Sequence, residues 1–271
     1  MVEIAVEGLI HVYPEGEARA LDGVDLRIGP GERVALIGQN GSGKTTLVRH
    51  LNGLLRPTAG TVRLDGTDAA RLTVAQLAAR VGLVFQDPDR QIFSGSVRSE
   101  VEFGARNVGL RDSARHAAVA TALHATGLDG EEATNPYDLG GARRKLLALA
   151  SVLAMETPVL VLDEPTTGQD APGVERVREI VESASAAGRT VIAISHDMRF
   201  VAEAFERVVV MRAGRVILDG SPATVFARDA WEDLASTYLE PPRAVVVGDR
   251  LGVGSTPTDA RLVEALRARP G

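Results

Sequence analysis

A glycine-rich segment of eight residues restricts the fold of this chain more than any other stretch. The segment GQNGSGKT, from Gly38 to Thr45, matches G-x-x-x-x-G-K-[ST] at every fixed position. A buried strand is predicted immediately before it, over residues 34–37, and a helix after it, over residues 44–54. A strand, this loop and a helix in that order are typical of a phosphate-binding loop (P-loop), and they predict an α/β fold of the P-loop type.

The residue types of this loop suit a nucleoside triphosphate bound with Mg²⁺. Glycines let the backbone wrap with its N–H groups aimed at phosphate oxygens, Lys44 neutralises the β- and γ-phosphates, and the Thr45 hydroxyl can ligate Mg²⁺. A chance glycine-rich turn is the alternative, but lysine occurs only at Lys44 and Lys145 in a chain that otherwise uses arginine. The residues predicted to bind the nucleotide here are Gly38, Gln39, Asn40, Gly41, Ser42, Gly43, Lys44, Thr45 and Thr46.

Composition excludes several classes of protein. The chain has 271 residues, 45% of them hydrophobic and none of them cysteine, which allows one large or two modest domains without disulfides or thiolate metal sites. A net charge of -6 argues against a chain that mainly grips nucleic acid. No apolar run approaches the roughly 18 residues that cross a bilayer, and glutamates stand where a signal peptide would be basic. We expect a cytoplasmic protein that reaches a membrane only through other proteins or a local patch.

The first half of the chain alternates between sheet-forming and helical patterns. Alternating residues over 3–13 and 20–38 predict an antiparallel sheet that leads into the buried strand, with a turn at residues 29–31. Residues 60–69 predict another short hairpin. Residues 87–154 lose strand signals and gain helical ones, which predicts an inserted helical subdomain.

The second half returns to strands. Near-continuous apolar runs over residues 158–164 and 190–197 predict parallel strands buried on both faces. An amphipathic helix over residues 173–188 is expected between them. The remaining expectations are a hairpin over 207–220, helical structure past Pro222, an irregular segment over 241–260 and a last short helix over 260–269.

Polar residues that follow predicted strands are candidate catalytic groups. After VLVL, Asp163 is placed to hold Mg²⁺ and Glu164 to act as general base on water. His196 could donate a hydrogen bond to the γ-phosphate or to the water, and Gln86 could orient the water and contact Mg²⁺. Packed or solvated side chains are the alternative for His196 and Gln86. The predicted catalytic set is Lys44, Gln86, Glu164 and His196, and the predicted Mg²⁺ ligands are Thr45, Gln86 and Asp163.

Taken together and in this order, these motifs resemble the nucleotide-binding subunit of ATP-binding cassette (ABC) transporters over nearly the first 225 residues. The resemblance implies that the chain binds and hydrolyses ATP, that Tyr13 stacks on adenine, and that Gln86 links the site to a membrane subunit. A tyrosine packed in a sheet is the alternative for Tyr13. His196 then corresponds to the switch histidine, and in PTTGQD the carboxylate of Asp170 reaches across a dimer. In that dimer each ATP lies between one subunit's P-loop and the other's signature segment, usually L-S-G-G-Q.

Two further stretches are similar to the ATPases of energy-coupling factor (ECF) importers, which include the cobalt and nickel systems. They are VFQDPDRQIFSGSVRSEVEFGARNVGL, over 84–110, and VLAMETPVLVLDEPT, over 152–166. The tail resembles the small C-terminal domain with which those ATPases pair, although a generic amphipathic ending is the alternative. We therefore divide the chain into an ATPase domain over 1–225 and an extension over 226–271.

The ECF resemblance also implies a setting and partners. It places the chain as a peripheral protein at the cytoplasmic face of the membrane, with a membrane-coupling subunit and a separate substrate-binding membrane subunit. Those importers take up vitamins or transition-metal ions, and this sequence does not specify the cargo. Nucleic acid is not among the expected partners.

The stretch NPYDLGGARRKLLALASVLA contains a glycine pair and a basic triplet, residues 143–145, that open a predicted helix. Such a helix start can hold an anion, although a charged loop before a helix is the plain alternative. Ungapped alignment places the ABC signature here. The aligned residues are Leu139 and Gly141, which match, and Gly140, Ala142 and Arg143, which replace serine, the second glycine and glutamine.

The degenerate signature predicts a partner that differs from this chain. The missing serine hydroxyl removes a charge-assisted hydrogen bond to the γ-phosphate of the ATP held by the other subunit, worth about 1.5 to 3 kcal/mol. The charge of Arg143 could compensate in part. We therefore expect a heterodimer with a second ATPase rather than a homodimer, in which this chain's P-loop pairs with an intact signature and performs most of the hydrolysis.

Other functions compete with this one. A mainly regulatory or structural nucleotide-binding subunit, and the ATPase of another ABC transporter class, are the alternatives that remain. A soluble P-loop enzyme, or an ABC protein of DNA repair or translation, would need a long coiled-coil insertion or duplicated cassettes, and 271 residues contain neither. The complete set of Lys44, Asp163, Glu164 and His196 favours hydrolysis.

Overall fold

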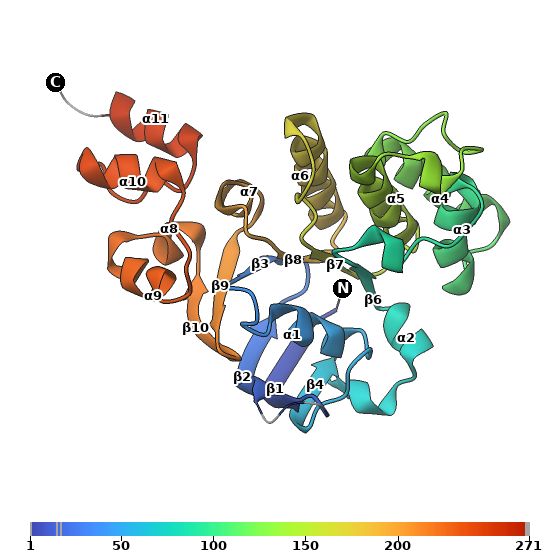
Figure 1. Ribbon diagram of the computed structural model, residues 1–271, viewed down its shortest axis with the longest axis horizontal. Coiled ribbons are helices and arrows are strands. Elements are labelled where there is room, and N and C mark those ends of the chain that lie inside the picture. Colours follow the sequence, from blue (N-terminus) through green and yellow to red (C-terminus); the bar gives the residue numbers. More distant parts are fainter. Residues whose placement is uncertain (1, 15, 17, 269–271) are drawn as a thin grey trace.

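Two β-sheets that share a hydrophobic core form the centre of the fold (Figure 1). The computed structural model describes residues 2–14, 16 and 18–268, and within them the first sheet has the strand order β2-β1-β4-β5. Its antiparallel pairing confirms the sheet and the short hairpin predicted from the sequence. Its strands are β1 (Ile4–Val12), β2 (Arg19–Ile28), β4 (Ala59–Leu64) and β5 (Thr67–Asp68).

The second sheet has the order β10-β9-β3-β8-β7-β6 within the described residues. Its neighbours pair in parallel, except that β10 pairs antiparallel with β9 at one edge. This confirms the parallel strands and the final hairpin. The strands are β3 (Arg33–Ile37), β6 (Val81–Val84), β7 (Val159–Asp163), β8 (Thr190–Ile194), β9 (Arg207–Arg212) and β10 (Arg215–Gly220).

Alternate residues of the central strands face two different cores. In β3, Val34 and Leu36 belong to the core between the two sheets, whereas Ala35 and Ile37 belong to the core on the helical side. Because both faces of these strands are covered, their interior positions are apolar, and the period-two alternation seen in β1 and β2 is lost.

Helices cover the second face of the larger sheet and both ends of the molecule (Figure 1). The α-helices in the described residues are α1 (Lys44–Leu51), α2 (Val74–Ala78), α3 (Val97–Asn107), α4 (Asp112–Thr126), α5 (Gly141–Leu153), α6 (Ala171–Ala186), α7 (Met198–Ala204), α8 (Pro222–Val225), α9 (Trp231–Ala235), α10 (Arg243–Arg250) and α11 (Asp259–Arg267). The 3₁₀ turns are η1 (Ala69–Arg71), η2 (Pro88–Arg90), η3 (Pro136–Asp138) and η4 (Arg228–Ala230).

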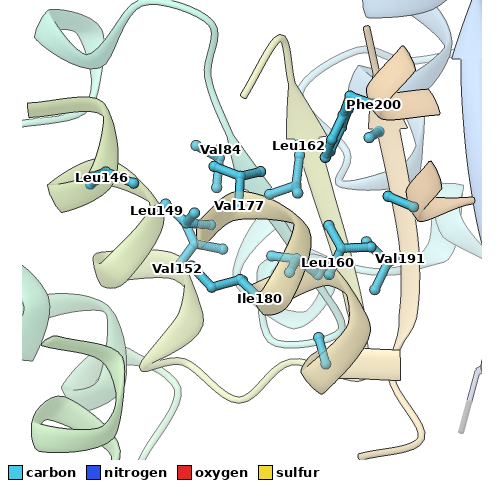
Figure 2. Close-up of a cluster of buried hydrophobic side chains, with 14 of the residues drawn as sticks. Val84, Leu146, Leu149, Val152, Leu160, Leu162, Val177, Ile180, Val191 and Phe200 are labelled. Atoms are coloured by element: carbon cyan, nitrogen blue, oxygen red, sulfur yellow. The ribbon is translucent and has the colours of Figure 1, made fainter. Parts of the chain in front are cut away.

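The helical core fixes the sheet against α5 and α6. Figure 2 shows side chains of α5, such as Leu149, and of α6, such as Ile180, gathered beside Leu160 and Leu162 of β7. These residues are at most 5% exposed. The packing holds the carboxyl end of β7 in place, where two of the predicted site residues follow.

The middle of the chain is helical, as its pattern predicted. The stretch 87–154 contains α3, α4 and α5, and these three helices contact one another. Helix α3 begins at a reciprocal cap in which Ser96 and Ser99 bond each other's backbone N–H groups. The treatment of this stretch as a separate subdomain stays a prediction.

Helix α6 confirms the amphipathic helix predicted between the two strands, although it spans Ala171–Ala186 rather than 173–188. Two other predictions about helices are wrong. Helix α1 ends at Leu51 rather than at residue 54, because Gly53 adopts the left-handed conformation with φ 78°, which ends a helix. The segment expected to be irregular over 241–260 contains α10, in which Ala244 and Val245 are buried. The row of valines there has low helix propensity, and packing of an apolar face overrides it. The last helix is present as α11, while the expected end at Arg269 lies outside the described residues.

Candidate active site

The P-loop connects β3 to α1 and borders a cavity of about 440 Å³. Gly38 has a φ of 144°, and a Cβ atom there would lie 2.1 Å from the carbonyl oxygen of Met211, so only glycine fits this position. Gly38 and Gln39 lie at the base of the loop, outside the cavity lining. The cavity is lined by Tyr13, Ala20, Asn40, Gly41, Ser42, Gly43, Lys44, Thr45, Thr46, Gln86, Asp163, Glu164, Thr167, Ile194 and His196.

The ammonium of Lys44 is held by oxygen atoms of its own loop. Its Nζ donates to the carbonyl oxygens of Gly38 at 2.6 Å and Gln39 at 2.9 Å, and to Ser42 Oγ at 3.3 Å. The residue is 5% exposed, and burial lowers the pKa of Lys44 while the nearby Glu164 and Asp163 oppose that shift. The buried ammonium of Lys44, the first residue of α1, is placed to attract an anion into the cavity.

Asp163 lies at the end of β7 and faces the start of α1. Thr45 Oγ1 donates to Asp163 Oδ2 at 3.1 Å. Burial raises the pKa of Asp163, and the hydrogen bond from Thr45 opposes the shift. Gln86 lines the same cavity from the residues that follow β6.

Hydroxyl, carboxylate and amide oxygens, which Thr45, Asp163 and Gln86 bring to the lining of one cavity, are donors that Mg²⁺ takes beside phosphate and water. In the described residues no cluster of three or more His, Cys, Asp or Glu side chains could hold a metal by itself. The donor set of Thr45, Asp163 and Gln86 therefore fits a Mg²⁺ ion that depends on phosphate for part of its coordination.

Glu164 and His196 also line this cavity. Glu164 is 5% exposed and adopts a positive φ of 53°, and its Oε1 atom lies 3.2 Å from His196 Nε2. At that distance the two groups can attract each other, but Oε1 makes no hydrogen bond with any described residue. The other oxygen, Oε2, accepts from Thr167 Oγ1 at 3.3 Å. Burial raises the pKa of Glu164. One carboxylate oxygen thus remains able to accept a proton from water.

Tyr13 enters the cavity from the antiparallel sheet. Its hydroxyl shares a hydrogen bond of 3.1 Å with Thr46 Oγ1, and its ring packs edge-to-face against His11 with centroids 4.6 Å apart. A ring held in this way can present one face to a flat ligand. Stacking of Tyr13 on adenine stays a prediction.

The basic triplet at the start of α5 bonds to other residues of the same chain. Arg143 pairs with Glu131 at 2.8 Å, and Arg144 donates to the carbonyl oxygen of Leu139 at 2.9 Å. Lys145 Nζ donates to the carbonyl oxygens of Glu164 and Thr167, at 2.9 and 2.8 Å. These pairs weaken the expectation that Arg143 supplies charge in place of the missing serine hydroxyl.

The predicted signature residues lie apart from the P-loop cavity. Within the described chain none of residues 139–143 lines it, so the structure does not bring the signature and the P-loop together. Asp170 caps α6 by accepting from the N–H group of Gly173 at 2.9 Å. The role of Asp170 across a dimer stays a prediction.

Sequence patterns missed two side chains, Lys145 and Gln169, that form hydrogen bonds between α5 and the loop after β7. Gln169 Nε2 donates to the carbonyl oxygen of Ala142 at 2.9 Å, beside the contacts of Lys145 described above. The use of lysine in a chain that otherwise uses arginine was the only signal for Lys145. No signal in the sequence indicated Gln169. The hydrogen bonds of Lys145 and Gln169 depend on how α5 packs beside the loop after β7, which the local sequence does not specify.

Comparison with known proteins places this geometry in a family. The family model described as ABC transporter matches residues 21–167. The chain is 40% identical to the energy-coupling factor transporter ATP-binding protein EcfA of Methanothermobacter thermautotrophicus, over 96% of this chain and 83% of that protein. It is 42% identical to EcfA2 of Symbiobacterium thermophilum, over 92% of this chain and 88% of that protein.

A solved structure and a longer relative extend the comparison. The structure of cbiO1 from Clostridium perfringens, part of the ABC transporter complex cbiONQ, superposes with a TM-score of 0.75 at 36% identity, covering 92% of this chain and 98% of that one. The chain spans 44% of a putative ABC transporter ATP-binding protein of Caldanaerobacter subterraneus, at 41% identity. No described helix has the length and apolar character that a membrane crossing requires.

Replacing Glu164 with glutamine should stabilise the ligand-free protein at neutral pH. Because burial raises the pKa of Glu164, the folded state favours the neutral acid, and stability falls as pH rises through that pKa. The Glu164→Gln variant keeps the shape without the charge, so its Tm should exceed that of the wild type at pH 8. The difference should shrink toward about pH 4, where the carboxyl is protonated. Thermal unfolding across this range tests the expectation, and an equal Tm at every pH would refute it.

Proposed function

Because this chain belongs to the ABC transporter family of ATP-hydrolysing subunits, we propose that it powers a membrane importer of the ECF type. The observation that carries the proposal is the gathering of Lys44, Asp163, Glu164 and His196 around one cavity at the P-loop. Its cargo is a vitamin or a transition-metal ion recognised by another subunit. The chain itself sits at the cytoplasmic face of the membrane, joined to a membrane-coupling subunit.

The residues around the cavity divide the work of hydrolysis. The P-loop amides and the Lys44 ammonium bind and neutralise the phosphates of ATP. Thr45, Asp163 and Gln86 hold Mg²⁺, which when bound offsets the charge that develops on the phosphates. The free Oε1 atom of Glu164 accepts the proton of the attacking water. His196, whose Nε2 lies 3.2 Å from that oxygen, is placed to donate a hydrogen bond to the attacking water or to the γ-phosphate.

A second ATPase subunit supplies the other half of this site. Helix α5 begins at Gly141 with Gly140 as its N-cap, so no hydroxyl is present to bind a partner's γ-phosphate. Arg143 is already paired with Glu131, and so its charge is a poor substitute. These features support a heterodimer in which the partner's intact signature closes over this chain's ATP, while the site at the partner's P-loop is the weaker one.

A surface near Gln86 suits the membrane-coupling subunit. A groove of about 680 Å³ lies between α2, α3 and α5, and its lining includes Phe93 and Phe103. These rings are 60% and 36% exposed and pack edge-to-face with centroids 4.7 Å apart. Exposed aromatic pairs of this kind are typical of protein interfaces. Their position in the segment after Gln86 supports a path from the membrane subunit to the active site.

The C-terminal extension, over 226–271, contributes to pairing of the two ATPases. Its helices α10 and α11 leave Val247, Leu251, Val263 and Leu266 between 38% and 45% exposed. Apolar side chains that a monomer leaves uncovered support a contact with another protein chain. Residues 269–271 of the extension lie outside the described part of the chain.

Replacing Glu164 with glutamine tests hydrolysis in the assembled importer. Removal of the general base should lower kcat roughly 100-fold or more, because that is the usual contribution of such a group. The Glu164→Gln subunit should still bind ATP and should remain dimerised with its partner when ATP is present, as measured by phosphate release and size-exclusion chromatography.

Glu179→Gln is the matched control, since Glu179 is an exposed residue of α6. The Glu179→Gln variant should leave both kcat and ATP-dependent dimerisation unchanged. Turnover that is unchanged by Glu164→Gln, but is abolished when the partner's own site is disabled, would instead support the regulatory alternative.

Restoration of the signature should accelerate the partner's site. The triple change Gly140→Ser, Ala142→Gly and Arg143→Gln returns the missing hydroxyl to the start of α5. The test is made in a complex in which this chain's own P-loop is disabled by Lys44→Ala. The turnover that remains, at the partner's P-loop, should then rise roughly ten-fold or more. Arg143→Gln alone restores no hydroxyl and should give a much smaller change. No rise in steady-state turnover with the triple variant would contradict unequal sites.

A further inference from the structure

The C-terminal extension contacts the base of the P-loop through one side chain. Thr237, between α9 and α10, is completely buried although it lies 198 residues from the loop in sequence. Its Oγ1 atom accepts a hydrogen bond of 2.8 Å from the N–H group of Gln39. The same hydroxyl donates to the carbonyl oxygen of Met211 at 3.4 Å. Thr237 therefore bridges the P-loop and the end of β9.

The bonded N–H group belongs to the peptide unit that also orients Lys44. The carbonyl oxygen of Gly38 and the N–H group of Gln39 are the two polar groups of one peptide bond, and in a trans peptide they point in opposite directions. The carbonyl accepts from Lys44 Nζ at 2.6 Å, while the N–H donates to Thr237. The peptide plane is thus held on both sides, by the phosphate-binding ammonium and by the extension.

The turn that presents Thr237 is itself well defined. Helix α9 ends in a pair of hydrogen bonds, from the N–H of Leu239 to the carbonyl of Leu234 and from the N–H of Tyr238 to the carbonyl of Ala235, both at 3.0 Å. Tyr238 adopts the left-handed conformation with φ 56°, as this helix ending requires. Leu239 is buried and anchors the turn, which fixes Thr237 on its inner side.

We infer that Thr237 is a positioning residue for ATP binding. It acts through the 38–39 peptide to set the place of the Lys44 ammonium, so the C-terminal extension is part of the nucleotide site as well as a candidate surface for pairing. Without the hydroxyl, the Gln39 N–H loses its partner and the peptide is free to rotate, which displaces an acceptor of Lys44. This inference rests on the proposed function, because it concerns the same ATP site.

Two substitutions at one position test the role of the hydroxyl. Thr237→Val keeps the shape and removes the hydrogen bonds, and Thr237→Ser keeps the hydroxyl and removes a methyl group. In the full-length chain, Thr237→Val should raise the Kd for Mg²⁺·ATP roughly ten-fold by calorimetry. In the assembled importer it should raise KM similarly with kcat within about two-fold, because the catalytic groups Glu164 and His196 are untouched. Thr237→Ser should stay within about two-fold of the wild type in all three quantities.

Thr256→Val is the matched control within the same extension. Thr256 is 3% exposed, and its hydroxyl donates to the carbonyl oxygen of Ala244 at 2.8 Å, with no contact to the P-loop. It should lower Tm as Thr237→Val does but leave the Kd for ATP unchanged. Thr237→Ala, which removes the same hydroxyl, should reproduce the weaker binding of Thr237→Val.

Two results would overturn the inference: a Kd for Thr237→Val equal to that of Thr256→Val, or a Kd for Thr237→Ser as weak as that of Thr237→Val. Binding of ATP by the wild type reports on the proposed function separately, so the failure of one idea is distinguishable from the failure of the other.

Discussion

The bonds between the buried ammonium of Lys44 and the carbonyl oxygens of its own loop are the interaction on which the site depends. They keep a cation out of water and aimed at the cavity, where phosphate oxygens can replace the weaker carbonyl acceptors. The loop can hold the ammonium in this way because β3, which precedes it, packs against a hydrophobic core on each face. In addition, Gly38 lets the backbone pass close to the carbonyl oxygen of Met211. The rest of the site follows from strand order. Residues after β6, β7 and β8 reach the same edge of the sheet as the P-loop, since those strands run parallel to β3.

Sequence patterns therefore predicted the parts of the site that lie at strand ends. The composition of the apolar runs predicts strands that are buried on both faces. Parallel pairing brings the ends of these strands together, and with them the residues that follow, Lys44, Asp163, Glu164 and His196. Contacts set by the packing of distant segments were not visible. Thr237 and Lys145 reach their partners only because α9 and α5 dock where they do. Helix α10 was missed for a similar reason, since burial of one face overrides the low helix propensity of its valines.

The start of α5 bears on the proposal that this chain combines an active P-loop site with a weak signature. Its basic side chains, which in isolation suggest an anion site, instead bond Glu131 and the carbonyl oxygens of Leu139, Glu164 and Thr167. Lys145 and Gln169 connect this helix to the loop after β7, at Glu164 and at the residues that follow it. The helix thus supports the chain's own active site mechanically, while it offers a partner's phosphate only backbone N–H groups.

Titration of the purified chain with Mg²⁺·ATP tests the central claim most directly, with an exposed arginine of α3, Arg98, as the matched cationic control. We predict one ATP bound per chain for the wild type and for Arg98→Ala, because Arg98 lies outside the cavity lining. For Lys44→Ala we predict affinity at least roughly ten-fold weaker, since the charge-assisted contact to phosphate is lost. Equal affinity in the Lys44→Ala and Arg98→Ala chains, or no binding by the wild type, would contradict the claim.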